Sequence, residues 1–380
     1  MNELGIYVHI PFCIKKCYYC DFISYANRDD KIEEYVNALI KEIKMQSNKL
    51  DNKDYITTIY IGGGTPSSIN ANFINQIIET VMKNYNVDKN AEITIEVNPG
   101  TVTEEKLQIY KRCGVNRISI GLQSTKNELL KQIGRIHTYE DFLSCYSFAR
   151  KVGFKNINVD LMLGLPNQKI EDLEESIRKV INLNPEHISL YSLILEENTP
   201  LEEMISKKTL KLPSDELERK MYWETKRILE ENGYLHYEIS NYAKNGFLSR
   251  HNTNCWKQKE YLGFGVAAHS YYKNKRYNNL NQIEKYCKNI NEDRIEENRT
   301  IQEIQRDEEK QKEYMLLGLR MIEGVNIQDF KNKFVQNPIY LFHKELEKLV
   351  KEGLLEIDLN QIKLTSKGLD FANLVWEEFI

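Results

Sequence analysis

The sequence predicts an α/β protein: a partial or full (β/α) barrel followed by a small C-terminal winged-helix-like α+β domain. Three observations support this prediction. Strand-like and helix-like segments alternate through the first two thirds of the chain. Several of the strands are apolar along their whole length, as expected when both faces of a parallel sheet are covered. The tail, from residue 313, shows three helices, a hairpin and a last helix.

The alternation begins close to the N-terminus, where residues 6–10 alternate as a strand around Tyr7 and His9. About six βα units precede residue 200, and short connections between them favour a parallel sheet. Functional residues are therefore expected at the rim where the strands end. The expected strands are 6–10, 58–61, 92–97, 117–121, 157–163 and 187–195, and the expected helices are 34–45, 72–85, 104–113, 141–152 and 170–183.

The pattern loosens after residue 213. A long helix is expected at 216–231 and a further strand at 234–242. Residues 291–312 are densely charged and low in apolar side chains, which predicts a linker with a solvated helix. The expected organisation is a barrel core over 1–235, an extension over 236–290, a charged linker over 291–312 and a C-terminal domain over 313–380.

Composition excludes several classes of protein. Lys and Arg total 52 against 56 Asp and Glu, so a net charge of −4 gives no global attraction to nucleic acid. We expect no signal peptide, because residues 1–12 contain no basic region followed by a long apolar core. We expect no membrane span, because no apolar run approaches about 20 residues. Four of the seven cysteines are scattered rather than arranged as a disulfide framework, which favours the cytoplasm.

Three cysteines crowd into one loop directly after the first predicted strand, at Cys13, Cys17 and Cys20. A four-iron cluster takes one thiolate per iron, so three cysteines leave one iron open to an outside ligand. Zinc is the competing interpretation, but it prefers four ligands and paired cysteines. The loop therefore favours a [4Fe–4S] cluster whose open iron is chelated by S-adenosylmethionine (SAM).

Glycines and polar residues follow the later strands. The run Gly62–Gly64 ends the second strand, and glycines let the backbone approach a ligand closely. Alone, such a run is more often an ordinary turn, but one βα unit after the cysteine loop it favours a ligand site. Structural hydrogen bonds would explain any single polar residue equally well. Four of them in successive units, Glu96, Gln123, Arg135 and Asp160, favour a shared site.

With these residues assembled, the chain resembles the coproporphyrinogen oxidase-like branch of the radical SAM superfamily over nearly its whole length. Within this branch it is more similar to the heme chaperones than to the oxidases. The matching phrases are YVHIPFCIKKCYYCDF, IYIGGGTPS, EITIEVNPGTV, GVNRISIGLQS, GRIH, DLMLGLP, RHNTNCW, YLGFGVAAHS and YMLLGLRMIEGV.

The resemblance implies three cofactors or ligands: a [4Fe–4S] cluster on the cysteine triplet, SAM, and heme or a porphyrin. It also implies a hemoprotein acceptor at or near the membrane, and a homodimer. Whether SAM is turned over stays open. The SAM contacts that it implies, position by position, are Tyr7, Tyr19, Gly63, Gly64, Thr65, Glu96, Gln123, Arg135 and Asp160.

Three functions compete: a chaperone that delivers heme to respiratory hemoproteins, an oxygen-independent coproporphyrinogen III oxidase (dehydrogenase), and a radical SAM enzyme for another substrate. The oxidase pattern has an N-terminal extension and a fourth cysteine where this chain has Phe22. The segment with His251, Trp256 and His269 resembles the heme-associated region of the chaperones, which favours the first function. We therefore predict a heme contact at His251. Cys255 replaces a family tyrosine, and is either a tolerated change or a thiolate near the heme.

Overall fold

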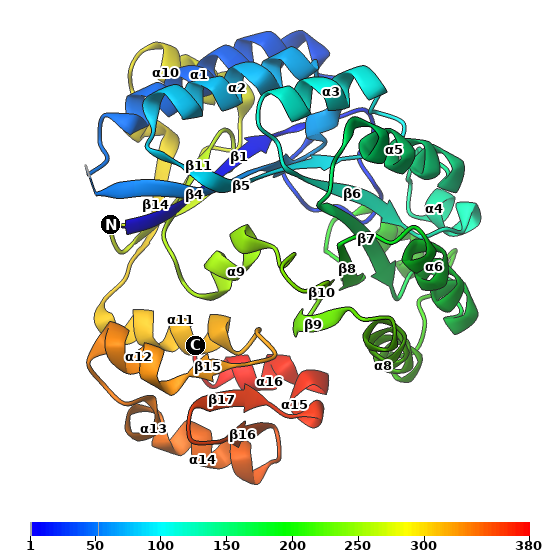
Figure 1. Cartoon of the computed structure of the whole chain (residues 1–380), viewed down its shortest axis with the longest axis vertical. Helices are drawn as coiled ribbons and strands as arrows, with labels where there is room; N and C mark the ends of the chain where they lie inside the picture. Colours follow the sequence, from blue (N-terminus) through cyan, green and yellow to red (C-terminus); the bar gives the residue numbers. More distant parts are fainter. Residues whose placement is uncertain (1, 52) are drawn as a thin grey trace.

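The structure is a computed structural model that describes residues 2–51 and 53–380. Parallel strands form its centre (Figure 1). They belong to the largest sheet of the described residues, a mixed sheet of twelve strands in the order β14-β13-β12-β11-β1-β4-β5-β6-β7-β8-β10-β9. The sheet curves into a partial barrel, as predicted, with β14 and β9 as its two edges. Its parallel strands are β11 (Tyr261–Phe264), β1 (Asn2–Ile10), β4 (Asp54–Gly63), β5 (Val87–Val97), β6 (Arg117–Gln123), β7 (Ile157–Leu163) and β8 (His187–Ser192).

Helices cover the outer face of this sheet (Figure 1). Each presents one apolar side to the strands; α6, for example, buries Leu173, Ile177 and Val180 at helical spacing. The inner face is polar, because alternate strand residues point to opposite faces. The covering helices are α1 (Ile32–Ser47), α2 (Ala71–Asn84), α3 (Glu104–Arg112), α5 (Tyr139–Val152), α6 (Ile170–Asn182) and α8 (Asp215–Glu231). The short helices α4 (Asn127–Gln132) and α7 (Pro200–Ser206) contribute to a separate apolar cluster that includes Tyr18 and Tyr19.

The prediction of one continuous strand at 234–242 is wrong. The structure has two short antiparallel strands there, β9 (Leu235–Glu238) and β10 (Asn241–Ala243). The turn forms because the Glu238 carboxylate accepts hydrogen bonds from the backbone of Ser240 and the side chain of Asn241. Local side-chain bonds of this kind end a strand that periodicity alone would continue.

The extension adds to the opposite edge of the sheet. Its strands β12 (His269–Tyr272) and β13 (Lys275–Asn279) continue from β11 as antiparallel neighbours, and α10 (Ile283–Asn291) packs on α1. The short helix α9 (Arg250–Trp256) lies between the sheet and the C-terminal domain (Figure 1).

The prediction that residues 291–312 are a linker with a solvated helix is also wrong in part, because it missed a strand. Residues Arg299–Ile304 form β14, the edge strand that pairs with β13, and α11 (Asp307–Gly318) begins three residues later. An edge strand exposes one side to water, and Ile301 is 55% exposed. An exposed edge strand of this kind therefore has the polar composition that is typical of a linker. The division of the chain into four parts stays a prediction.

The C-terminal domain has a hydrophobic core of its own, built from α11 and the segments that follow. A three-stranded sheet of β15 (Val325–Asn326), β17 (Gln361–Leu364) and β16 (Leu355–Ile357) lies beside its helices. Arg320 joins this domain to α9, since its guanidinium lies 4.4 Å from the ring of Trp256 and 5.0 Å from that of Trp376. The remaining helices are α12 (Ile327–Phe334), α13 (Pro338–Leu341), α14 (His343–Lys351), α15 (Ser366–Asp370) and α16 (Ala372–Glu377).

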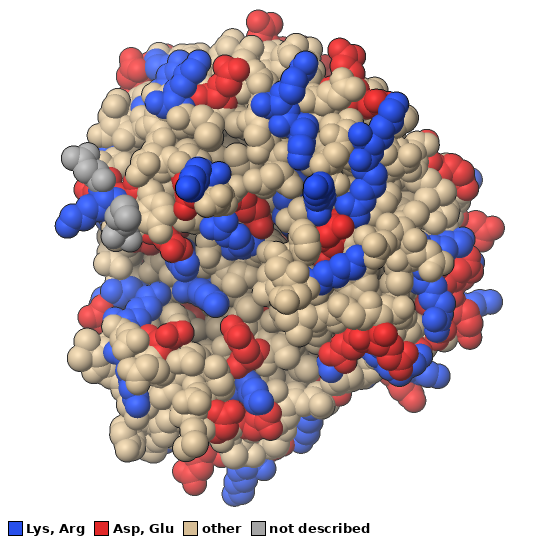
Figure 2. Space-filling model, viewed as in Figure 1, with Lys and Arg blue, Asp and Glu red and all other residues tan. Residues whose placement is uncertain are grey.

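The surface carries both signs of charge. Figure 2 shows basic and acidic side chains interspersed on the face it presents. Among the helices of the described chain, none is both long and apolar enough to cross a membrane.

Candidate functional site

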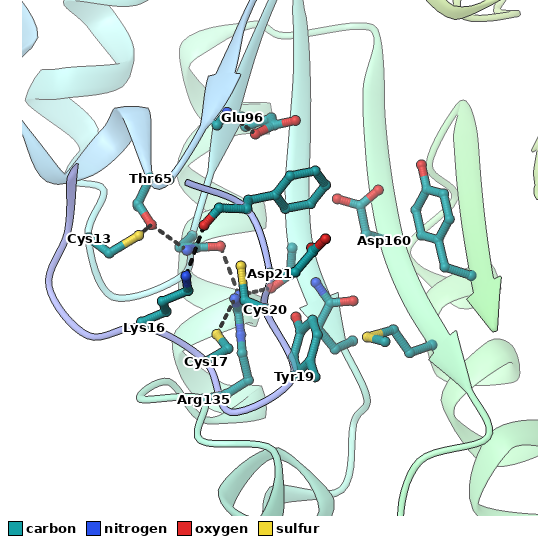
Figure 3. Close-up of a pocket in the computed structure, with 18 of the residues that line it drawn as sticks. Cys13, Lys16, Cys17, Tyr19, Cys20, Asp21, Thr65, Glu96, Arg135 and Asp160 are labelled. Atoms are coloured by element: carbon teal, nitrogen blue, oxygen red, sulfur yellow. Dashed lines mark hydrogen bonds between the residues drawn. The ribbon is translucent and has the colours of Figure 1, made fainter. Parts of the chain in front are cut away.

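A pocket of about 440 Å³ opens where β4, β5, β6, β7 and β8 end (Figure 3). It brings together residues that are far apart in the sequence, including the cysteine loop after β1 and the glycine run after β4. Every residue predicted for the cluster or for SAM lines it, with the exception of Tyr7. Those that line it are Cys13, Cys17, Tyr19, Cys20, Gly63, Gly64, Thr65, Glu96, Gln123, Arg135 and Asp160.

The cysteine loop is held on both sides of the thiols. A two-stranded parallel pair, β2 (Phe12–Cys13) and β3 (Tyr25–Ala26), closes the loop. Thr65 donates its hydroxyl to Cys13 Sγ at 3.5 Å, and Arg135 donates to Cys17 Sγ at 3.5 Å. Burial raises the pKa of Cys20 to about 11, and binding of iron to this thiol would release its proton.

Three thiols in one loop match the ligand set of a four-iron cluster with one open iron. In the chain as described, no group of three or more His, Cys, Asp or Glu converges closely enough to hold one metal ion. A four-iron cluster takes each thiolate on a different iron, so its ligands surround a larger object. The three cysteines are free thiols at one end of the pocket (Figure 3).

The glycine run is packed against the cysteine loop, which explains its composition. The backbone N–H of Gly64 donates to Ile10 O at 2.9 Å, and that of Thr65 donates to Phe12 O at 2.8 Å. A Cβ on Gly64 would lie 2.7 Å from Phe12 O and 3.0 Å from Cys13 Sγ. Only glycine fits so close an approach, so the run forms one wall beside the thiols.

Two buried carboxyl groups line the pocket beyond the cysteines (Figure 3). Glu96 accepts hydrogen bonds from the Tyr60 hydroxyl at 2.8 Å and from the Gly63 N–H at 3.1 Å. Burial raises the pKa of Glu96 to about 7, although the Tyr60 hydrogen bond opposes this effect. Asp160 accepts from Asn158 at 2.7 Å, and burial raises its pKa as well. Such carboxyls favour a ligand with positive charge.

Two polar atoms in the same pocket are buried without a partner, namely Gln123 Oε1 and Arg135 Nε. Gln123 also ends β6 with a φ of 70°, which is uncommon outside glycine and typical of functional sites. The other guanidinium nitrogens of Arg135 bond Asn98, Gly121 and Cys17. An acceptor and a donor are therefore left for a ligand.

These features fit a [4Fe–4S] cluster with SAM. The carboxyls suit the ammonium and sulfonium charges of SAM, Arg135 Nε suits an oxygen acceptor, and the three thiols would leave one iron for chelation. When bound, a reduced cluster would be able to supply an electron to the sulfonium of SAM. The residues of the chain contribute orientation, charge and exclusion of water.

Several lining residues escaped the sequence analysis. Asn98 and Tyr60 lie within the phrases EVNPG and IYIGGG, and Tyr60 alternates with apolar neighbours on β4, which was the available signal. The end of β8 adds Tyr191 and the loop after it adds Ile194, both exposed. No local pattern distinguishes these two from ordinary loop residues.

Three predicted site residues lie outside the pocket lining. Tyr7 donates to or accepts from His9 Nδ1 at 2.9 Å and stacks on Tyr60. His251 is only 7% exposed, and burial lowers its pKa to about 4. Cys255 is half-buried on α9, and burial raises its pKa to about 11. Heme contacts at His251 and Cys255 stay predictions.

A three-cysteine loop beside a glycine run, at the rim of a partial (β/α) barrel, defines a radical SAM protein. In agreement, residues 7–180 match the model of the radical SAM superfamily, and residues 306–371 match that of the HemN C-terminal domain. The chain is 37% identical to proteins named heme chaperone HemW from Lactococcus lactis and from Bacillus subtilis. Each alignment covers 98% of this chain, and 96% and 98% of the relative, respectively. The protein therefore belongs to the HemW family of radical SAM proteins.

The fold has a solved counterpart. The structure of coproporphyrinogen III oxidase (HemN) from Escherichia coli superposes with a TM-score of 0.85, covering all of this chain and 90% of the other. The two sequences are 23% identical, so this likeness concerns the fold.

Proposed function

We propose that this protein is a heme chaperone, a radical SAM [4Fe–4S] protein that binds heme and delivers it to respiratory hemoproteins. The observation that carries the proposal is the 37% identity, over 98% of the chain, to relatives named heme chaperone. Phe22 adds support, because it is 65% exposed at the pocket where the oxidase pattern has a fourth cysteine.

Within this function, the pocket residues hold the cluster and SAM. Cys13, Cys17 and Cys20 bind three irons, while Glu96 and Asp160 face the cationic part of SAM. Arg135 joins the two ligand sites, since it touches Cys17 Sγ and also keeps a free Nε toward the pocket. Buried charges of this kind are costly without a partner, so their presence supports a charged ligand.

The alternative is an oxygen-independent coproporphyrinogen III oxidase. The fold shared with the Escherichia coli oxidase, at a TM-score of 0.85 over the whole chain, is compatible with this second candidate. A radical SAM enzyme acting on a substrate that is not a porphyrin is the third.

An anaerobic assay separates these candidates. The iron-reconstituted protein is incubated with reductant, SAM and coproporphyrinogen III, and protoporphyrinogen is followed by fluorescence after oxidation. Heme binding to the same preparation is followed by its absorption spectrum. The chaperone predicts heme bound and no product. Product over many turnovers would make the protein an oxidase, and neither heme bound nor product would favour the third candidate.

The wider setting is also a proposal. We place the protein in the cytoplasm, since none of the seven cysteines forms a disulfide within the described residues. Its acceptor would be a hemoprotein at or near the membrane, and its assembly a homodimer. Co-purification of an acceptor hemoprotein, followed by transfer of heme to it, tests the first point. The mass of the protein in solution tests the second.

A further inference from the structure

Tyr60 stacks on two other aromatic rings in the interior of the barrel. Its ring is stacked on His251 of α9, with centroids 5.1 Å apart and planes inclined by 29°. It also stacks on Tyr7, with centroids 6.3 Å apart. Its hydroxyl donates to Glu96 in the pocket at 2.8 Å. Tyr60 therefore touches both the SAM pocket and α9, whereas His251 is not part of the pocket lining.

Helix α9 is fixed against the same two strands that carry the pocket residues. The backbone N–H groups of Arg250 and His251 each donate to the Glu92 carboxylate at 3.0 Å. His251 Nδ1 and Thr58 Oγ1 share a hydrogen bond of 2.9 Å. Thr58 precedes Tyr60 by two residues on β4, and Glu92 precedes Glu96 by four on β5. Alternate strand residues share a face, so α9 and the pocket share one interior wall.

The contact between Tyr60 and Glu96 leaves little room for the ring to move alone. A Cβ on Gly62 would lie 2.9 Å from the Tyr60 ring and 2.9 Å from the Glu96 carboxyl carbon. The three residues thus pack closely, and close-packed groups transmit displacements to one another. A shift of α9 that moves His251 therefore changes the support of Tyr60 and, through it, of Glu96.

The same stack reaches the cysteine loop. Tyr7 shares a hydrogen bond of 2.9 Å with His9 Nδ1, and His9 Nε2 shares one of 2.8 Å with the carbonyl of Ile23. Ile23 lies three residues after Cys20. Glu96 in turn accepts the N–H of Gly63. The Tyr60 ring thus supports the glycine run on one side and the exit of the cysteine loop on the other.

We propose that Tyr60 is a positioning residue that couples helix α9 to the SAM pocket, so that each site changes the ligand affinity of the other. Such coupling is reciprocal by thermodynamic necessity. The part that involves heme at α9 depends on the proposed function. The part that involves SAM affinity and the packing of His251 does not.

A double-mutant cycle tests the coupling in the full-length, cluster-reconstituted protein. SAM affinity is measured anaerobically by equilibrium dialysis for the native chain, His251→Ala, Tyr60→Leu and the double variant. We expect His251→Ala to weaken SAM binding about fivefold, although His251 does not line the pocket, and to have no further effect in Tyr60→Leu. Equal effects of His251→Ala in both backgrounds, or no effect in the native chain, would overturn the proposal.

A matched control is His236→Ala. His236 is also buried and stacks on a tyrosine, Tyr242, with centroids 4.4 Å apart, but neither residue lines the pocket. Loss of a histidine from a stack of this kind removes comparable packing. We expect SAM affinity to stay within twofold of the native value. If SAM affinity falls as much as in His251→Ala, the effect comes from a general loss of packing, and the proposal is refuted.

The conservative variant Tyr60→Phe tests the pH dependence of SAM binding, which packing alone does not change. It keeps the stack and removes only the hydroxyl that donates to Glu96. Because that hydrogen bond lowers the pKa of Glu96, the pH at which SAM binding reaches half its maximum should shift upward. The other groups facing Glu96 are unchanged in this variant, namely Tyr7, Arg117, Asp160 and Tyr191. An unchanged pH profile would contradict the role of the hydroxyl.

The heme measurement distinguishes the two proposals. SAM affinity is determined with and without added heme, and we expect at least a threefold difference in the native chain that disappears in Tyr60→Leu. Protein that binds no heme would refute the proposed function, while the His251–Tyr60 cycle would still decide the coupling. Heme binding that leaves SAM affinity unchanged would refute the coupling alone. Cluster content and circular dichroism confirm that each variant is folded.

Discussion

The buried carboxyl of Glu96 should make the protein less stable as the pH rises. Its folded pKa of about 7 lies above the ordinary value of 4.5 because the group is buried. The folded state therefore retains a proton between pH 4.5 and 7 that the unfolded chain has released, so stability is full below pH 4.5 and falls as the pH rises through 7. The difference of about 2.5 pH units corresponds to about 3 kcal/mol above pH 7.

Glu96→Gln removes this titration without a large change in shape. Relative to the native chain, the variant should gain about 3 kcal/mol between pH 4.5 and pH 8, whatever its stability at acid pH. For a chain of 380 residues this gain is about 4 °C in the unfolding temperature. Thermal unfolding of cluster-free protein, followed by circular dichroism at several pH values, measures the difference. The same variant should bind SAM more weakly, because a neutral amide no longer pairs with a cation.

The control is Glu105→Gln on the exposed side of α3. Its stability relative to the native chain should stay within about 0.5 kcal/mol at every pH. The unfolding temperature of each protein is plotted against pH. If the plots of Glu96→Gln and the native chain run parallel from pH 4.5 to 8, the carboxyl does not titrate as the buried site requires. The explanation of its role would then be wrong.

Three other substitutions test the cluster, the domain junction and the core. Cys13→Ser should abolish the iron–sulfur absorbance of the reconstituted protein while Cys113→Ser keeps it; equal spectra would remove the loop as the cluster site. Arg320→Ala, which empties the space between two tryptophans, should cost about 2 kcal/mol and speed proteolytic release of the C-terminal domain, and unchanged cleavage would contradict this. Glu42→Leu removes the acceptor of three buried hydrogen bonds and should cost about 3 kcal/mol in urea unfolding, so a neutral result would refute that network.

The βα alternation and the cysteine loop could be predicted from the sequence because both are local patterns. Apolar residues recur with the period of a strand or a helix whatever lies opposite them. The spacing of Cys13, Cys17 and Cys20 describes one loop, and parallel strands necessarily end at one rim. These two facts, together with the family resemblance, collected eleven lining residues of the pocket from segments far apart in the chain.

Other features depended on the environment of a residue rather than on its neighbours in sequence. Residues 299–304 have the composition of a linker, and only pairing with β13 makes them a strand. The turn after Glu238 likewise depends on which backbone groups its carboxylate reaches.

By itself, the sequence determined the class of fold, the cysteine triplet and the rim at which the ligand residues gather. Only the tertiary structure decided which side chains touch. Arg135 lies 118 residues from Cys17 and donates to its sulfur, and His251 lies 191 residues from Tyr60 and stacks on its ring. Such contacts follow from strand register and from the packing of α9 against β4 and β5. Neither leaves a periodic trace in the sequence, because each is a single meeting of two side chains brought together by the packing of the whole chain.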